Sequence, residues 1–149
     1  MFSWGARGIV HALQHPTHGV GVGLDVPPAA ELRVFAGMNL YFDDQADLRM
    51  AALYEACDRL GVVREKAVGQ TALAQALAAS SMLAYPTLVP ETSCIVAMEA
   101  LASGCAVVTS DLGALSETTS GFGHLLPFDA ERQRFVAAFT QKVVSALRT

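Results

Sequence analysis

The chain has 149 residues, of which 52% are hydrophobic and 16% are charged, and its formal net charge is −4. This composition excludes an intrinsically disordered chain and fits one globular domain that is long enough to bury a sizeable core. The acidic balance and the lack of a dense Lys/Arg run disfavour nucleic acid as a partner.

Cysteine usage and hydropathy bear on the cellular compartment. Cys57, Cys94 and Cys105 are odd in number and widely spaced, so they predict neither a disulfide framework nor a zinc motif. No apolar run approaches the ~20 residues that span a bilayer, and the N-terminus lacks the pattern of a signal peptide. We therefore expect a cytoplasmic location.

The N-terminal segment predicts a helix start and then a loop. Residues 9–13 suggest the beginning of a helix. Residues 14–30 are expected to form a flexible loop, because their glycines lack the G-x-G-x-x-G spacing and a Pro-Pro pair follows in place of a helix. No metal site is expected from the neighbouring histidines, because a proline interrupts them and no acidic residue is close: His11, His15 and His18.

Strands and helices alternate from residue 31 onward. A strand over residues 31–37 precedes a helix over residues 47–60, and a second strand lies within residues 62–68. A short Ala-rich helix over residues 71–79 follows, with Thr71 as its cap.

The central stretch predicts a strand, a loop, a helix and a further strand. The first strand covers residues 82–85, and the helix is expected to start at Thr92 or Ser93, because hydroxyl caps satisfy open N–H groups. The helix stops near Gly104, and a β-branched strand follows over residues 106–109. This is a βαβ unit whose loop lies where open α/β sheets bind ligands.

Two carboxylates flank the start of this helix. Glu91 precedes it and Glu99 lies inside it, where a helical side chain leans back toward the N-terminus. The open N–H groups near Ser93, Cys94 and Ile95, together with the helix dipole, favour an anion such as a diphosphate. A phosphorylated sugar has both phosphate oxygens for the amides and hydroxyl donors for the carboxylates.

The C-terminal part completes an α/β pattern with a helical turn over residues 116–119, a strand over residues 122–126 and a long helix over residues 129–147. Apolar residues at helical spacing predict that one face of the long helix is buried: Phe135, Ala138, Phe139, Val143 and Leu147. The fold predicted for the single domain of residues 1–149 is a Rossmann-like three-layer α/β/α open parallel sheet.

One ordered series of residues stands out: Glu91-x7-Glu99, Ala100, Gly104, Val107-Val108 and Gly113-x3-Glu117. It resembles the C-terminal, donor-binding domain of GT-B glycosyltransferases in the retaining family 4. This domain is one half of the GT-B architecture. The resemblance covers nearly all of the chain, and its specificity is concentrated between Pro86 and Glu117. Thr92-Ser93-Cys94 replaces the usual Gly/Phe-Gly sequence, and Ala114 replaces a second Gly, as in a branch of the family with a similar P-E-T-S-C-I segment.

The resemblance also implies roles for individual residues. Glu91 is the implied catalytic residue, which contacts the transferred sugar, and Glu99 is the implied ligand of the ribose hydroxyls. Glu117 is expected to bond backbone amides. The remaining donor-binding positions are Arg7 at the diphosphate, Lys66 and Val68 near the base, and the backbone of Thr92, Ser93, Cys94 and Ile95 at sugar and phosphate.

The implied reaction transfers a sugar from a UDP- or GDP-linked nucleotide sugar to an acceptor with retention, without a metal or other cofactor. The usual acceptors in the family belong to cell-surface polysaccharide, glycan or glycolipid biosynthesis, which would bring the chain to a membrane periphery. The family's first strand and its N-terminal acceptor-binding domain are expected to be missing. We therefore expect little turnover from this chain without that domain or a partner chain, whether it is truncated, a gene fragment or half of a split enzyme.

Two alternatives come from other classes. A non-catalytic nucleotide- or protein-binding module with a Rossmann-like fold would fit the missing glycines after Glu91. A flavodoxin-like signalling domain would need a cluster of aspartates at strand ends, and Asp43-Asp44 lacks a convincing partner lysine.

Overall fold

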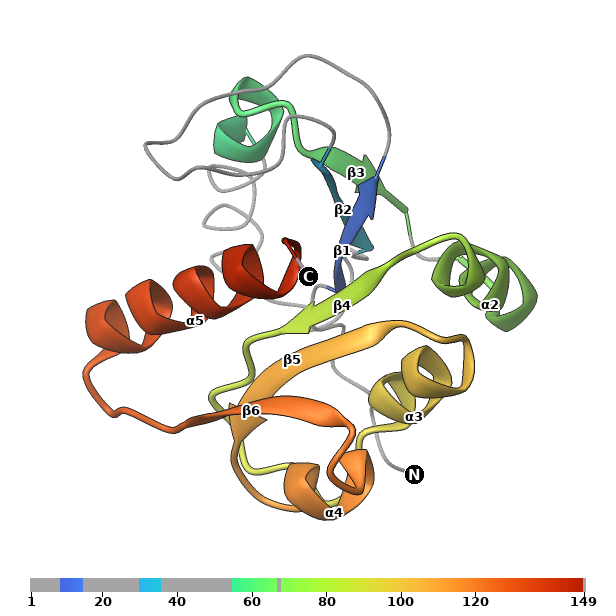
Figure 1. Ribbon diagram of the computed structural model, residues 1–149. Coiled ribbons are helices and arrows are strands. Elements are labelled where there is room, and N and C mark those ends of the chain that lie inside the picture. The colour runs from blue at the N-terminus through green and yellow to red at the C-terminus, as the bar shows by residue number, and fades with distance from the viewer. Residues whose placement is uncertain (1–8, 15–29, 36–54, 67, 149) are drawn as a thin grey trace, which may run out of the picture.

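The computed structural model describes residues 9–14, 30–35, 55–66 and 68–148. These residues form a six-stranded sheet with helices on both faces, which is a Rossmann-like α/β fold (Figure 1). The strands are β1 (Ile9–Gln14), β2 (Ala30–Phe35), β3 (Val63–Glu65), β4 (Met82–Tyr85), β5 (Ala106–Asp111) and β6 (Gly123–Pro127). The helices are α2 (Gln70–Ala78), α3 (Ile95–Ala102), α4 (Leu115–Thr119) and α5 (Arg132–Ala146), and residues 55–59 are also helical.

The sheet has the strand order β3-β2-β1-β4-β5-β6. This is the order of a doubly wound dinucleotide-binding sheet, in which ligands bind outside the carboxyl ends of the strands. β2 is parallel to β3, and β5 is parallel to both β4 and β6, whereas β1 is antiparallel to β2 and β4. Five strands therefore run in one direction, and β1 runs against them.

The prediction of a helix start at residues 9–13 was wrong, because this segment is strand β1. β1 pairs with β2 along its whole length and with β4 from Val10 to Ala12. Pairing on both edges satisfies the backbone groups, and a short apolar run with adjacent β-branched residues does not distinguish a strand from a helix by its period. The same strand makes the sheet mixed, where a wholly parallel sheet was predicted.

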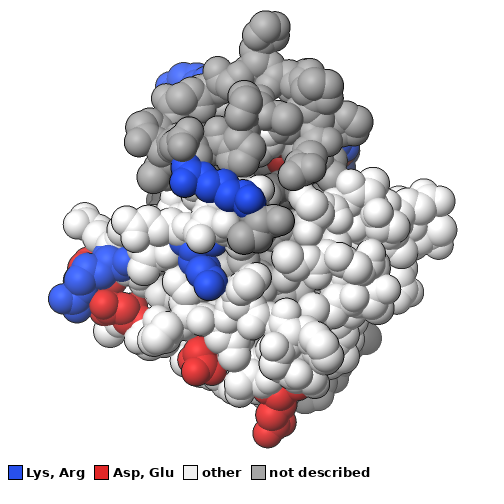
Figure 2. Space-filling model, viewed as in Figure 1, with Lys and Arg blue, Asp and Glu red and all other residues white. Residues whose placement is uncertain are grey.

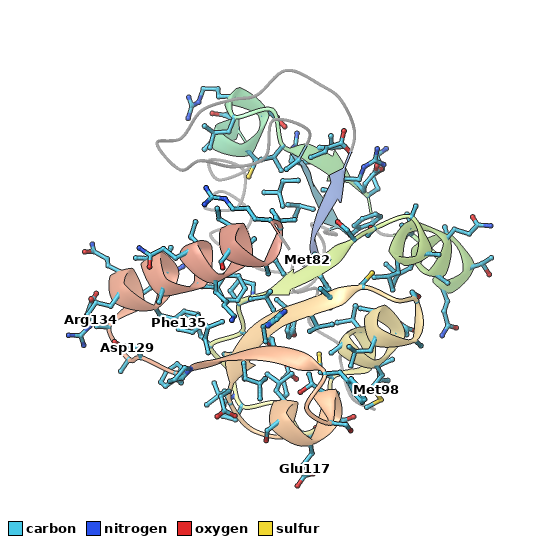
Figure 3. The ribbon with its side chains drawn as sticks, in the orientation of Figure 1. Met82, Met98, Glu117, Asp129, Arg134 and Phe135 are labelled. Atoms are coloured by element: carbon cyan, nitrogen blue, oxygen red, sulfur yellow. The ribbon has the colours of Figure 1, made fainter. Side chains whose placement is uncertain are left out.

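The core lies on both faces of the central strands, since all four residues of β4 are buried. Side chains alternate along β4 and β5, as strand geometry requires. One face packs against α2, α3 and α4 through Leu77, Leu83, Tyr85, Cys94, Ala97, Ala100, Cys105, Val107 and Leu115. The other face packs against α5 through Met82, Ala84, Val108, Leu126, Phe135 and Phe139 (Figure 3).

The elements predicted from residue 82 onward are confirmed within a few residues at each boundary. β4 covers the predicted range of residues 82–85, and Gly104 follows α3 with a φ of +85°. On the predicted buried face of the long helix, Phe135 and Phe139 are buried and Val143 and Leu147 are partly buried, as expected, whereas Ala138 is exposed.

Two earlier predictions are tested only in part. The loop over residues 14–30 lies outside the described residues apart from its ends, and the helix over residues 47–60 is described, and helical, only from residue 55 to residue 59.

The prediction that Thr71 caps the next helix was wrong, because Gly69 takes the N-cap position of α2 in an extended conformation without a side-chain bond.

Candidate functional site

The loops after β3, β4 and β5 lie at one edge of the sheet, because these three strands point the same way. Their described residues are 66, 68–69, 86–94 and 112–114. The longest of them carries Glu91 and leads into α3, so the candidate site is built around it. This is the carboxyl edge, where the strand order predicts a ligand.

Buried hydroxyl groups of β5 fasten the start of the loop after β4. Thr109 Oγ1 donates to the carbonyl oxygen of Tyr85 at 2.8 Å, and Ser110 Oγ donates to that of Thr87 at 2.7 Å. Thr109 and Ser110 are fully buried, so neither hydroxyl can exchange its partner for water without cost. The loop therefore leaves the sheet in a fixed direction.

The backbone of Glu91 is held by the loop after β5. Glu91 and Gly113 form a parallel β-bridge, and the amide of Ala114 donates to the carbonyl oxygen of Glu91 at 2.7 Å. Gly113 has a φ of +65°, and a β-carbon there would lie 2.5 Å from the Glu91 nitrogen. Only glycine combines this φ with so close an approach.

The side chain of Glu91 is half-buried and bonded to a core residue. Tyr85 Oη donates to Glu91 Oε1 at 2.8 Å. Glu91 is therefore held at the carboxyl edge in two ways. Gly113 and Ala114 hold its backbone, and Tyr85 holds its side chain.

Helix α3 begins at Ile95, with Cys94 as its N-cap and no side-chain cap bond. The predicted start at Thr92 or Ser93 is slightly too early, because the bridge to Gly113 ties Glu91 to the loop after β5 and residues 92–94 are not helical. Thr92 and Ser93 are exposed, whereas Cys94 is buried. Cysteine does not cap a helix as serine or threonine does.

The first turn of α3 presents open amides. In the described part of the chain no group accepts from the backbone N–H of Ile95 or of Val96, which is the normal state of a helix N-terminus without a cap. The turn also lacks an acidic side chain. Its amides and the helix dipole therefore favour an anion at this point.

Glu99 faces the neighbouring helix α2. Its Oε1 accepts from Gln70 Nε2 at 3.3 Å, and its side chain is half-buried. Gln70 is the first residue of α2 and directly follows the connection that holds Lys66 and Val68, both of which are exposed. This contact brings the predicted base-binding connection beside α3.

Positive side chains are scarce in this region. Residues 67–131 contain neither lysine nor arginine, so Lys66 is the last cationic residue before Arg132. In the view of Figure 2, Lys and Arg side chains do not gather over α2, α3 or α4. In the described loops of this edge, backbone amides and Lys66 are therefore the groups that attract an anion. Arg7, the other predicted phosphate ligand, lies outside the described residues.

The family model described as glycosyl transferases group 1 matches residues 31–148. The match covers most of the chain and nearly all of the elements that build the candidate site. The chain belongs to the family of glycosyl transferases group 1. No curated protein and no solved structure shows significant similarity to it.

Glu117 of this glycosyltransferase chain does not bond backbone amides as predicted. Its side chain is exposed and points away from α4 (Figure 3), and no amide of a described residue donates to it. The reason is the orientation of α4, which buries Leu115 and Thr119. Glu117 lies two residues from each of them, on the outer side of the helix.

Metal binding and membrane insertion find no support in the part of the chain that the structure describes. Among these residues no group of three or more His, Cys, Asp or Glu side chains is arranged to hold a metal ion. None of the described helices is long and apolar enough to cross a membrane. A metal-independent reaction remains a prediction from the family resemblance.

Sequence reasoning missed the residues that hold the two glutamates. Tyr85 was placed only at the end of a strand, Gln70 carried no signal, and Gly113 was matched to a motif without a physical role. A tyrosine that is the last buried residue of a strand indicates a polar partner nearby, because a buried phenol usually needs one. For Gln70 no comparable signal exists in the sequence.

Proposed function

We propose that this chain is the donor-binding part of a GT-B glycosyltransferase, which together with an acceptor-binding domain transfers a sugar from a nucleotide sugar with retention at the anomeric carbon. The observation that carries the proposal is the placement of Glu91 and Glu99 on either side of the open N-terminus of α3, at the carboxyl edge of the sheet. Family membership supports the transfer of a sugar, and this placement supports the donor site.

The diphosphate of the donor would lie against the first turn of α3. The N–H groups of Ile95 and Val96 are oriented by the helix, so they can stabilise the charge that grows on the diphosphate as the glycosidic bond breaks. No reorganisation of these amides is needed at that moment, because the loop before them is already fixed by β5. Lys66 would supply the one positive side chain in the described loops of this edge.

The two glutamates would take different parts of the donor. Glu91 is fixed through its backbone and its side chain, which suits a residue that must orient the transferred sugar at the reacting carbon. Among the described residues, only Gln70 bonds the side chain of Glu99, at 3.3 Å, and a pair of ribose hydroxyls could replace this bond. The products are a glycoside of the acceptor and the free nucleoside diphosphate. We assign the acceptor to a second domain, as in two-domain GT-B enzymes.

The proposal is tested by calorimetric titration of the chain with UDP, GDP and their common sugar conjugates. Glu99→Ala is expected to weaken binding by about 1–3 kcal/mol, because a polar ribose would lose its acceptor. Glu55→Ala is the matched control: Glu55 is exposed on the helical segment of residues 55–59, which Figure 1 shows far from α3.

Each outcome has a distinct meaning. Loss of affinity in Glu99→Ala alone would support the ribose role. The nucleotide that binds more tightly, UDP or GDP, would identify the base. Equal losses in Glu99→Ala and Glu55→Ala would contradict it. Tight binding of a nucleoside diphosphate that no attached sugar improves would favour the alternative of a non-catalytic nucleotide-binding module.

A further inference from the structure

The hydroxyl group of Tyr85 joins the hydrophobic core to the predicted catalytic carboxylate. Tyr85 is the last residue of β4 and is 5% exposed, and its ring lies in the core between the sheet and α3. Its Oη donates to Glu91 Oε1 at 2.8 Å. A buried phenol on a rigid strand thus reaches a half-buried carboxylate on a loop, six residues further along the chain.

Both partners of this bond have fixed backbones. The carbonyl oxygen of Tyr85 accepts from Thr109 Oγ1 at 2.8 Å, inside the sheet. The carbonyl oxygen of Glu91 accepts from the amide of Ala114 at 2.7 Å, and Gly113 allows the close approach. With both backbones fixed, the bond between Oη and Oε1 restrains the side-chain torsions of Glu91.

A carboxylate can accept about four hydrogen bonds, and the bond from Tyr85 uses one of these directions. Bonds to an ionised acceptor are shorter and stronger than neutral ones, so the phenol is an effective restraint. Glu91 Oε1 is thereby tied to the core, and the orientation of the carboxylate is restrained before any ligand arrives. Preorganisation of this kind is what a group that orients a sugar requires.

We propose that Tyr85 is a positioning residue, which holds Glu91 in the orientation that receives a hydroxyl group of the transferred sugar. This inference rests on the proposed donor-binding function. It assigns to Tyr85 no contact with the donor itself: Tyr85 acts through Glu91 and therefore affects only the sugar part of the donor. The nucleoside diphosphate part is bound elsewhere, by α3 and Glu99.

The test compares four proteins, each as the full chain: the natural sequence, Tyr85→Phe, Glu91→Gln and the double variant. Phenylalanine keeps the buried ring and removes only the hydroxyl, so the core stays filled. Each protein is titrated with a nucleoside diphosphate and with its sugar conjugate, using UDP with UDP-glucose and GDP with GDP-mannose. Thermal unfolding of each variant, followed by circular dichroism, reports whether the fold is retained.

Tyr85→Phe is expected to weaken binding of the sugar conjugate about 3- to 10-fold, the equivalent of one ordinary hydrogen bond, and to leave binding of the bare diphosphate unchanged. In the Glu91→Gln background the same substitution is expected to have little further effect, because its target has already been altered. This combination would not arise from a merely structural role.

Three results would overturn the inference. Equal weakening of the diphosphate and the conjugate would show that Tyr85 acts only on the fold. A full effect of Tyr85→Phe in the Glu91→Gln background would show that it does not act through Glu91. If the natural chain binds neither ligand of any pair, the donor-binding proposal fails and the role of Tyr85 fails with it; in the first two cases the natural chain binds, and only the role of Tyr85 is lost.

Discussion

Gly113 lies so close to the backbone of Glu91 that a β-carbon at position 113 would overlap it. Such an atom would be 2.5 Å from the Glu91 nitrogen and 3.0 Å from the carbonyl carbon of Pro90. The contact is made by backbone on both sides, so no side chain can move to relieve it. The position of the predicted catalytic residue is therefore set by a glycine on the next loop.

Gly113→Ala is expected to lower the free energy of unfolding by about 2–5 kcal/mol, and to weaken donor binding as well. About 1–2 kcal/mol arises from the left-handed conformation, and overlap with a packed neighbour adds about 1–3 kcal/mol. Gly104→Ala is the control, because Gly104 has a φ of +85° but nothing within 4 Å of its β-carbon position. Urea denaturation measures the free energy of unfolding of both variants. Equal losses of this free energy would refute a special role for the contact with Glu91.

Thr109→Val removes the hydroxyl that fastens the start of the loop after β4, while it keeps the volume of the side chain. The bond from Thr109 Oγ1 to the Tyr85 carbonyl oxygen is fully buried, so we expect a loss of about 1–2 kcal/mol in stability. Thr140→Val is the matched control, since its hydroxyl bonds the Val136 carbonyl oxygen on the exposed side of α5. Chemical denaturation measures both. A loss in Thr140→Val as large as that in Thr109→Val would contradict the prediction.

The three cysteines are expected to differ in reactivity toward a thiol reagent. Burial raises the pKa of the Cys105 thiol above its ordinary value, and this thiol also donates to the Leu77 carbonyl oxygen at 3.1 Å. Cys94 is buried as well, whereas Cys57 is partly exposed. Because the thiolate is the reactive form, iodoacetamide should label Cys57 first in the folded chain. Mass spectrometry of the digested chain checks this, and early labelling of Cys105 would argue against its buried position.

Asp129, which lies just before α5, is expected to make a pH-dependent contribution to the stability of the fold. The pKa of Asp129 lies below its ordinary value, because the Arg134 side chain donates hydrogen bonds to it and the Glu131 amide donates another. A carboxyl group with a lowered folded pKa stabilises the fold above its unfolded pKa, and this contribution disappears as the pH falls through the folded value. The difference in melting temperature between the natural chain and Asp129→Asn should therefore shrink on acidification. A constant difference would contradict this account. The difference in melting temperature between the natural chain and Arg134→Gln should shrink on acidification in the same way.

The parts of the fold that were predictable are those with a strong local pattern. β4 is apolar, β5 is rich in β-branched residues, α5 has a clear helical period, and Gly104 follows the end of α3 as an αL-tolerant residue should. β1 was missed because its strand character comes from pairing with β2 and β4, which are distant in sequence. Tertiary contacts of this kind leave no trace in a short apolar run.

In the candidate site too, features with a local sequence pattern were predictable and features set by distant contacts were not. Glu91 and Glu99 could be selected from their spacing and from a family resemblance, and the structure sets them at one edge of the sheet. The helix start was misplaced because the bridge between Glu91 and Gly113 overrides the preference of Thr92 and Ser93 for a capping position. That bridge joins residues that are far apart in the chain, and local propensity carries no information about it.

The most direct test of the central claim is a residue-resolved NMR titration of the 15N-labelled chain with UDP and GDP. The account places the diphosphate at the first turn of α3, so the largest changes in amide shift are expected for Ile95 and Val96. Smaller changes should appear at Gln70 and Glu99, and the amides of α5 should stay unaffected. Saturating shifts confined to α5 or to β6, or no shift at Ile95 and Val96 while the nucleotide binds, would contradict a donor site at this helix.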